Sequence, residues 1–187
     1  SNYVQISRHD RHDGENRRGI IAFAHSDVKN IVLISNSDDA ERSWHYLHLD
    51  IGTIAICNWY RPGASEMEHI ESLQAELNQY SHECIGCIIM GDLNIHHARW
   101  LRFSSGNTQQ GERLKAICDE FGLLQKIREA TRNDYLLDLV LTDMGDIKAS
   151  VQPCLADHKA ILVKIHIPVP VSLSTTRWGW IFKAASW

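Results

Sequence analysis

The N-terminal part of the chain alternates short apolar runs with polar segments, a pattern typical of β-strands joined by turns. Runs rich in β-branched and aromatic residues occupy residues 18–24, 30–35, 44–50 and 53–60. The segments between them are short and polar, so we expect these strands to form an antiparallel meander. Arg61-Pro62-Gly63 interrupts the pattern, which predicts that the meander ends there.

Two later segments change to the three- and four-residue spacing of an amphipathic helix. Residues 66–80 place apolar side chains on one face, and residues 109–121 do so again before Gly122, a residue type that commonly ends helices. The apolar positions of the first helix are Met67, Ile70, Leu73, Leu77 and Tyr80. We expect this face to pack in the core.

Residues 85–90 form an uninterrupted apolar run of strand length, as in a strand buried on both faces, and residues 136–141 and 160–167 are further strands. Strands followed by alternating helices and strands predict an α/β fold: two stacked, mostly antiparallel β-sheets flanked by helices. No interior linker is visible, so one domain is expected over residues 1–167, with a tail or linker at residues 168–187.

The composition agrees with one globular domain, because the chain has 187 residues, of which 44% are hydrophobic and 22% charged. No apolar run is long enough to span a bilayer, so no membrane partner is expected. The net charge of −4 excludes a global attraction to nucleic acid, and any such binding must be local. Arg8, Arg11, Arg17 and Arg18 cluster near the start, where a solvated surface and a phosphate-contacting patch are both open.

The five cysteines are an odd number, which favours reduced thiols and an intracellular protein over a secreted disulfide framework. Cys84-Ile85-Gly86-Cys87 has the spacing of a zinc-ligand pair. No second pair exists, and Cys87 opens an apolar strand, so a zinc site is not favoured.

Polar residues at the ends of apolar strands are the strongest candidates for chemistry. Asp92 and Asn94 follow the strand at 85–90, Asp138 stands among apolar residues that should be buried, and Asp157-His158 lies 19 residues further on. Each alone has a plain structural explanation, as a turn or a buried carboxylate. Together, carboxylates for a divalent cation, an amide for phosphate oxygens and a histidine for proton transfer indicate phosphoryl chemistry at one edge of a sheet.

These motifs resemble the endonuclease/exonuclease/phosphatase superfamily, and most closely the apurinic-type endonuclease domain of non-LTR (LINE-like) retrotransposons. The matching stretches are Asn58-Trp59-Tyr60-Arg61-Pro62, residues 91–100 with the pattern Gly-Asp-x-Asn-x-His-x-x-x-Trp, residues 137–142 around Asp138, and Ala156-Asp157-His158, where Ala replaces the usual Ser. Similar segments also lie at residues 8–11 and 177–187, the latter Trp/Lys-rich as in the segment that leads to a reverse transcriptase. The resemblance implies a four-layer α/β sandwich.

The resemblance also implies the reaction, a Mg²⁺-dependent (or Mn²⁺-dependent) hydrolysis of a DNA phosphodiester that leaves a 3′-hydroxyl for reverse transcription. By this resemblance Asp92 orients or activates the attacking water, and Asn94 binds the scissile phosphate. His158 stabilises the transition state, Asp138 supports the His158 imidazole, and Tyr60 contacts a phosphate oxygen. DNA would be the partner, a reverse transcriptase would be fused in the parent polyprotein, and the nucleus is the expected location.

The remaining implied roles concern the metal and the DNA. Asp157 and Asp92 would hold the cation, while Asn94, His97, Arg61 and Trp100 would bind substrate.

One departure from the family pattern affects the expected activity. The family's first two motifs, an Asn that closes the opening strand and a Glu that is the principal metal ligand, should lie upstream, and neither Asn2 nor Glu15 has the surroundings to replace them. We therefore expect an N-terminally truncated member that lacks the opening strands and nicks DNA weakly or not at all. Two alternatives stay open: an inactive remnant or DNA-binding fragment, and a phosphatase-type phosphoesterase of the same fold.

Overall fold

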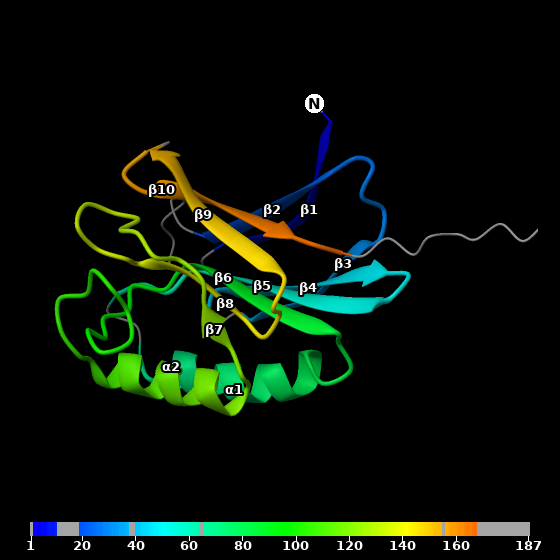
Figure 1. Ribbon diagram of the computed structural model, residues 1–187. Helices are drawn as coiled ribbons and strands as arrows, with labels where there is room; N and C mark the ends of the chain where they lie inside the picture. Colours follow the sequence, from blue (N-terminus) through cyan, green and yellow to red (C-terminus); the bar gives the residue numbers. More distant parts are fainter. Residues whose placement is uncertain (1, 11–18, 38–39, 64–65, 155, 168–187) are drawn as a thin grey trace, which may run out of the picture.

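A computed structural model describes residues 2–10, 19–37, 40–63, 66–154 and 156–167 (Figure 1). The described residues form ten strands and two helices. The strands are β1 (Tyr3–Asp10), β2 (Gly19–His25), β3 (Ile31–Ser37), β4 (Arg42–Leu49), β5 (Gly52–Trp59), β6 (Gly86–Asp92), β7 (Leu124–Gln125), β8 (Asp138–Thr142), β9 (Ile147–Cys154) and β10 (Lys159–Ile165). The helices are α1 (Glu68–Tyr80) and α2 (Gln109–Glu120).

The centre of the molecule is a six-stranded sheet in the order β3-β4-β5-β6-β8-β7. Strands β3, β4 and β5 pair antiparallel, as in the expected meander, but β2, the first strand expected in it, pairs with β1 in a separate hairpin. The chain then crosses through α1, so that β6 pairs parallel with β5, and β8 returns antiparallel to β6. Strands β6 and β8 are therefore neighbours, although 45 residues lie between Asp92, which ends β6, and Asp138, which begins β8.

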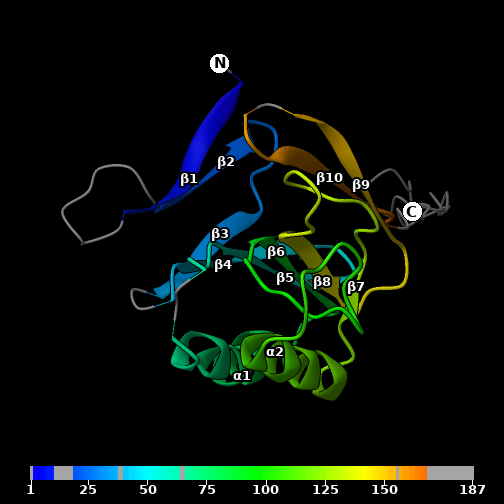
Figure 2. The same cartoon turned by 90° about the vertical axis from the view of Figure 1, so that its left-hand side faces the viewer.

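Both helices lie side by side on one face of this sheet (Figures 1 and 2). Their apolar stripes are buried, as the spacing predicted, and include Ile70, Leu73 and Leu77 of α1. A buried ion pair fixes α1 to the sheet: Arg42 Nε of β4 lies 2.8 Å from Glu76 Oε2, and the guanidinium carbon lies 4.7 Å from the centroid of the Trp59 ring.

The opposite face of the sheet carries two antiparallel hairpins, β1–β2 and β9–β10 (Figure 2). The predicted α/β fold with stacked sheets is therefore confirmed. Within the described part of the chain, the helices cover only the six-stranded sheet, and no helix is long and apolar enough to cross a bilayer.

Several boundaries differ from those expected from the sequence. Strand β1 was not expected, because it has no continuous apolar run and most of its side chains are exposed, Tyr3 and Val4 among them. Strand β8 begins at Asp138, so this carboxylate stands at a strand end and not in the middle of a buried strand. Glu15, three of the clustered arginines and the tail at 168–187 lie outside the described residues.

Candidate active site

Asp92 and Asp138 face each other across two antiparallel strands. Asp92 is the last residue of β6, Asp138 is the first residue of β8, and the two are direct partners in the strand register. Gly91 brings β6 to this point with a positive φ of 142°, and a Cβ at this position would lie 1.9 Å from the carbonyl oxygen of Trp59 in β5. Only glycine tolerates so close an approach, so the local sequence Gly-Asp sets where the first carboxylate stands.

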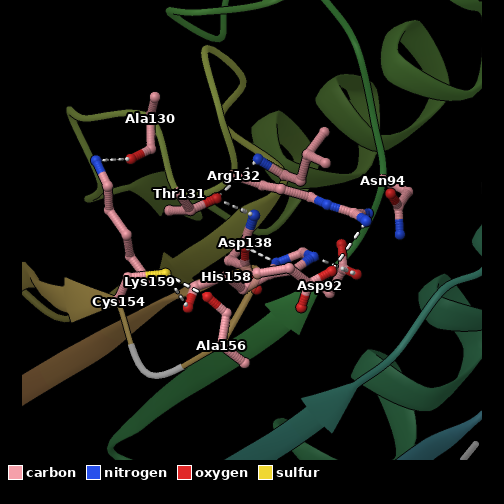
Figure 3. A network of polar contacts seen from close by, with 12 residues as sticks. Asp92, Asn94, Ala130, Thr131, Arg132, Asp138, Cys154, Ala156, His158 and Lys159 are labelled. Atoms are coloured by element: carbon pink, nitrogen blue, oxygen red, sulfur yellow. Dashed lines mark hydrogen bonds and ion pairs between the residues drawn. The ribbon is translucent and has the colours of Figure 1, made fainter.

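His158 joins the two carboxylates from the turn between β9 and β10 (Figure 3). Its Nδ1 atom lies 2.8 Å from Asp138 Oδ2, and its Nε2 atom lies 3.9 Å from Asp92 Oδ2. The three side chains are half-buried, and one potential ligand atom from each lies within 4.8 Å of the others. The hydrogen bond to Asp138 fixes the orientation of the ring and turns Nε2 toward Asp92.

Asp92 has the most perturbed carboxyl group of this cluster. Burial raises its pKa, and the nearby carboxylate of Asp138 raises it further, while His158 and hydrogen bonds from Asn94 oppose the shift. Its Oδ1 atom is buried and receives no well-formed hydrogen bond from the described residues. A buried carboxylate oxygen of this kind is suited to bind a cation or a water molecule.

The cluster opens into a pocket of about 560 Å³. Its lining comes from segments far apart in the sequence and consists of Gly19, Tyr60, Asp92, Arg132, Asp138, Asp157 and His158. Asp92, Asp138, His158 and Tyr60 are thus brought together at one edge of the sheet, as the sequence predicted. The lining is rich in charged groups, so the pocket suits a polar, charged substrate.

Two residues of this region, Thr131 and Arg132, were missed by sequence reasoning. Thr131 is fully buried, and its Oγ1 atom accepts hydrogen bonds from the backbone N–H groups of Leu137 (3.1 Å) and Asp138 (3.0 Å). Arg132 lines the pocket, and its guanidinium lies 2.9 Å from Asp157 Oδ2. Their only signal in the sequence is a polar Thr-Arg pair shortly before the strand that carries Asp138.

Asp157 does not belong to the compact cluster of potential ligands, although we expected it to hold the metal. Its side chain is 69% exposed at the pocket rim and is paired with Arg132. Among the described residues, the group with metal-ligand geometry contains Asp138 in its place, together with Asp92 and His158.

Asn94 and Arg61 support the loop after β6. Asn94 adopts a positive φ of 47°, and its Nδ2 donates to the carbonyl oxygen of Arg61 at 3.0 Å. Arg61 is 1% exposed, and its guanidinium donates to the carbonyl oxygens of Leu93 (3.4 Å) and Asn94 (3.5 Å). Arg61 therefore lies beneath the loop, which differs from the direct substrate contact that we expected.

His97 and Trp100 also lie away from the pocket. His97 is 4% exposed, its Nε2 atom is 3.1 Å from Glu112 Oε2, and its ring packs edge-on against Trp100. Trp100 lines a separate hollow with residues of α2 and β7. The loop that carries both residues packs against α2, so neither side chain lines the pocket of Asp92 and His158, and their expected contact with DNA stays a prediction.

The sequence was compared with known families and structures. Residues 54–162 match the sequence profile of the family described as endonuclease-reverse transcriptase, a span that contains Asp92, Asp138 and His158. The chain belongs to the endonuclease-reverse transcriptase family. This confirms the resemblance to retrotransposon endonucleases in the endonuclease/exonuclease/phosphatase superfamily, and places the chain in a family of enzymes. Comparison with the sequences of curated proteins finds no significant match.

Solved structures with a similar fold include relatives of the same superfamily. The endonuclease domain of TRAS1, a telomere-specific non-LTR retrotransposon, superposes with a TM-score of 0.71 at 15% identity, over 90% of this chain and 82% of that chain. An endonuclease/exonuclease/phosphatase family protein from Leptotrichia buccalis has a TM-score of 0.58 at 16% identity, over 88% of this chain and 72% of that chain. The endonuclease/exonuclease/phosphatase from Bacteroides vulgatus has a TM-score of 0.59 at 13% identity, over 88% of this chain and 77% of that chain. At these identities the likeness concerns the fold.

The donor set of this endonuclease-reverse transcriptase family member fits a divalent cation. Asp92 offers a buried oxygen with no other well-formed partner, and the carboxylate of Asp138 stands directly across the strand pair. Hard cations such as Mg²⁺ prefer carboxylate oxygens, and Mn²⁺ also accepts an imidazole nitrogen. Since His158 Nδ1 already contacts Asp138, only its Nε2 atom is left for a cation or a substrate.

Proposed function

We propose that this chain hydrolyses DNA phosphodiester bonds with the help of a divalent cation, most simply Mg²⁺, at the cluster of Asp92, Asp138 and His158, and that turnover is slow because the sequence lacks the Asn and Glu motifs expected of the family. One observation carries the proposal: Asp138 contacts His158 Nδ1, and His158 Nε2 faces Asp92. All three residues line the same charged pocket. The membership in the endonuclease-reverse transcriptase family supports it. The same family description supports a parent protein that also carries a reverse transcriptase. A nuclear location is proposed only as the place where a chromosomal DNA substrate would be found.

In the proposed reaction, Asp92 orients a water molecule and takes up its proton as the water oxygen attacks phosphorus. The bond between phosphorus and the 3′ oxygen breaks, the oxygen gains a proton, and a 3′-hydroxyl and a 5′-phosphate are left. The raised pKa of Asp92 makes it a better base than an ordinary aspartate, provided the pH stays above that pKa.

His158 is the proposed electrostatic partner of the phosphate. Its Nδ1 atom is held by Asp138, so in the imidazolium form of His158 the Nε2 atom is positioned to donate a hydrogen bond to a phosphate oxygen as negative charge builds up. Tyr60, which lines the pocket, is proposed to contact a second phosphate oxygen. Asn94, which hydrogen-bonds to Asp92, is proposed to keep Asp92 correctly placed relative to the phosphate. A bound divalent cation, held through Asp92, would neutralise phosphate charge and make the water easier to deprotonate.

Exposed aromatic side chains near the pocket favour DNA over a small phosphate ester. Tyr135 is 42% exposed, and it follows Arg132 on a turn closed by a 2.9 Å hydrogen bond from the Tyr135 N–H to the Arg132 carbonyl oxygen. Phe103 is 49% exposed, and its carbonyl oxygen accepts a hydrogen bond from Leu136 N–H. Exposed aromatic faces of this kind stack on nucleic-acid bases, whereas a small phosphate ester without a base makes no such contact.

The test is a supercoiled-plasmid nicking assay with Mg²⁺ or Mn²⁺, and with EDTA to remove the metal. Asp92→Ala and His158→Ala are each expected to reduce nicking by at least about 100-fold. Asp50→Ala and His82→Ala, which change exposed residues of the same types, are matched controls that should nick like the wild type. Nicking that survives both site variants, or that persists in EDTA, would reject the proposal. Faster turnover of small phosphate esters than of DNA would favour the phosphatase-type alternative.

A further inference from the structure

We propose that Arg132 is a substrate-binding residue that contacts a phosphate group of the DNA, and that Asp157 is its counterion when no DNA is bound. The inference rests on the proposed function, because it names a residue that binds the substrate of the same site. Arg132 is not among the site residues expected from the sequence.

The charge balance of the pocket is the first argument. The lining contains three carboxylates, Asp92, Asp138 and Asp157, and of the described lining residues Arg132 alone carries a permanent positive charge. A phosphodiester is an anion, so these three carboxylates repel it unless a positive charge lies nearby. A guanidinium presents five N–H donors in a planar fork that matches phosphate oxygens.

The second argument is that the backbone of Arg132 is firmly held. Thr131, directly before it, is buried and accepts two backbone hydrogen bonds at the start of β8. The Thr131 carbonyl oxygen accepts from Lys159 N–H at 2.8 Å, and Arg132 N–H donates to the Tyr135 carbonyl oxygen at 3.0 Å. The backbone of Arg132 is therefore fixed relative to Asp138 and to the turn that carries His158. Because it is already ordered, DNA binding costs little backbone conformational entropy here.

The third argument is that the head of the side chain remains accessible. The ion pair with Asp157 joins groups that are 42% and 69% exposed, and solvent screens such a pair strongly. Only one nitrogen of the guanidinium, at 2.9 Å, has Asp157 as its partner in that pair. A phosphate can therefore either replace the Asp157 carboxylate or bind beside it on the free part of the fork.

The experiment measures binding of a fluorescent DNA duplex in EDTA, by anisotropy at a series of salt concentrations. Arg132→Ala is expected to weaken binding by about tenfold and to reduce the slope of log affinity against log salt by about one. Arg132→Lys keeps the charge and should keep the slope. Arg128→Ala removes an exposed arginine that lines the separate hollow near Trp100, and serves as the matched control with unchanged affinity and slope.

Asp157→Asn separates this role from the metal-binding role that the sequence suggested. As a counterion of Arg132, Asp157 competes with DNA, so its neutralisation should tighten metal-free DNA binding by about two- to fivefold. A residue whose role is to hold the cation would leave the metal-free affinity unchanged, which counts against the proposal. The Arg132→Ala variant in the Asp157→Asn background should then lose the gain.

The two proposals fail in different ways. If the wild type binds DNA and Arg132→Ala matches Arg128→Ala in both affinity and salt slope, the assignment of Arg132 is overturned while the proposed reaction stands. If the wild type does not bind DNA in EDTA or in Mg²⁺, DNA is the wrong substrate and the proposed function fails with it. Thermal unfolding of each variant checks that the pocket is intact, since an exposed arginine should contribute little to stability.

Discussion

His158 Nδ1 lies 2.8 Å from Asp138 Oδ2, and this contact connects the turn after β9 to the first residue of β8. A neutral histidine donates from only one ring nitrogen, so a carboxylate at Nδ1 selects the tautomer with its proton there. The state of Nε2, which faces Asp92, is therefore controlled by the carboxylate of Asp138.

Replacing Asp138 by Asn tests this control. Asp138→Asn preserves the size of the side chain but replaces the carboxylate that accepts from His158 Nδ1 with a neutral amide. We expect the rate constant for nicking to fall by about 100-fold or more, with little change in DNA affinity, since a comparable change in catalytic triads is costly in the same way. Single-turnover nicking and DNA anisotropy measure the two quantities. A loss confined to affinity would contradict the assigned role.

The raised pKa of Asp92 predicts that this residue destabilises the fold near neutral pH. Burial is the main cause, followed by the charge of Asp138. Because the native state holds the Asp92 proton more tightly than the unfolded state does, the native protein binds more protons between the two pKa values, and the free energy of unfolding falls as the pH rises through that window. Above it, the full cost of the buried charge is present.

Asp92→Asn should therefore raise the melting temperature at pH 7 by about 2–4 °C, which corresponds to roughly 1 kcal/mol for a chain of this size, while it abolishes nicking. The difference from the wild type should shrink as the pH falls through the raised pKa of Asp92 toward values below 3.8, where the wild-type carboxyl becomes protonated in both states. Differential scanning fluorimetry in EDTA across this pH range checks both statements. An equal or lower melting temperature for Asp92→Asn at pH 7 would show that the carboxylate is stabilised by its surroundings.

Thr131 is predicted to be a structural support of the site. Its Oγ1 atom satisfies two backbone N–H groups at the entry to β8, and Thr131→Val removes the acceptor without changing the shape of the side chain. Leaving buried donors unpaired costs about 1–3 kcal/mol, so we expect unfolding to become easier by roughly 2 kcal/mol and nicking to fall because Asp138 loses its fixed position. Thr131→Ser retains the oxygen and is the matched control. Urea denaturation of the two variants provides the comparison, and equal stabilities would refute the role.

The main features of the fold and the centre of the site were predictable because each had a local signal. Asp92 follows a buried strand at a Gly-Asp step, and Asp138 and His158 stand beside further strands, so the topology of an α/β sheet brings them to one edge. Strand boundaries were less certain: β1 is mostly exposed and carries no apolar run, so no periodic signal marks it.

The features that were missed depend on contacts between distant segments. Whether Asp157 faces a cation or Arg132 is decided by how the turn after β9 lies against the turn before β8. The burial of His97 follows from its contact with Glu112 on α2, and that of Arg61 from carbonyl oxygens of the loop after β6. Residue type and spacing do not predict these contacts, because Asp157, His97 and Arg61 are each equally suited to face solvent or a ligand.

Gly91 is predicted to be irreplaceable in placing Asp92. A Cβ at residue 91 would lie 1.9 Å from the carbonyl oxygen of Trp59, and the φ of 142° is itself unfavourable for any other residue. Since β5 and β6 are paired in the middle of the six-stranded sheet, neither strand can move away without disturbing its other neighbour. Gly91→Ala should therefore destabilise the protein by about 3 kcal/mol or more and displace the Asp92 carboxylate. Gly145→Ala is the matched control, because no atom lies within 4 Å of the added Cβ. Thermal unfolding distinguishes the two variants, and a Gly91→Ala protein as stable as Gly145→Ala would mean that β5 and β6 are not as close as described.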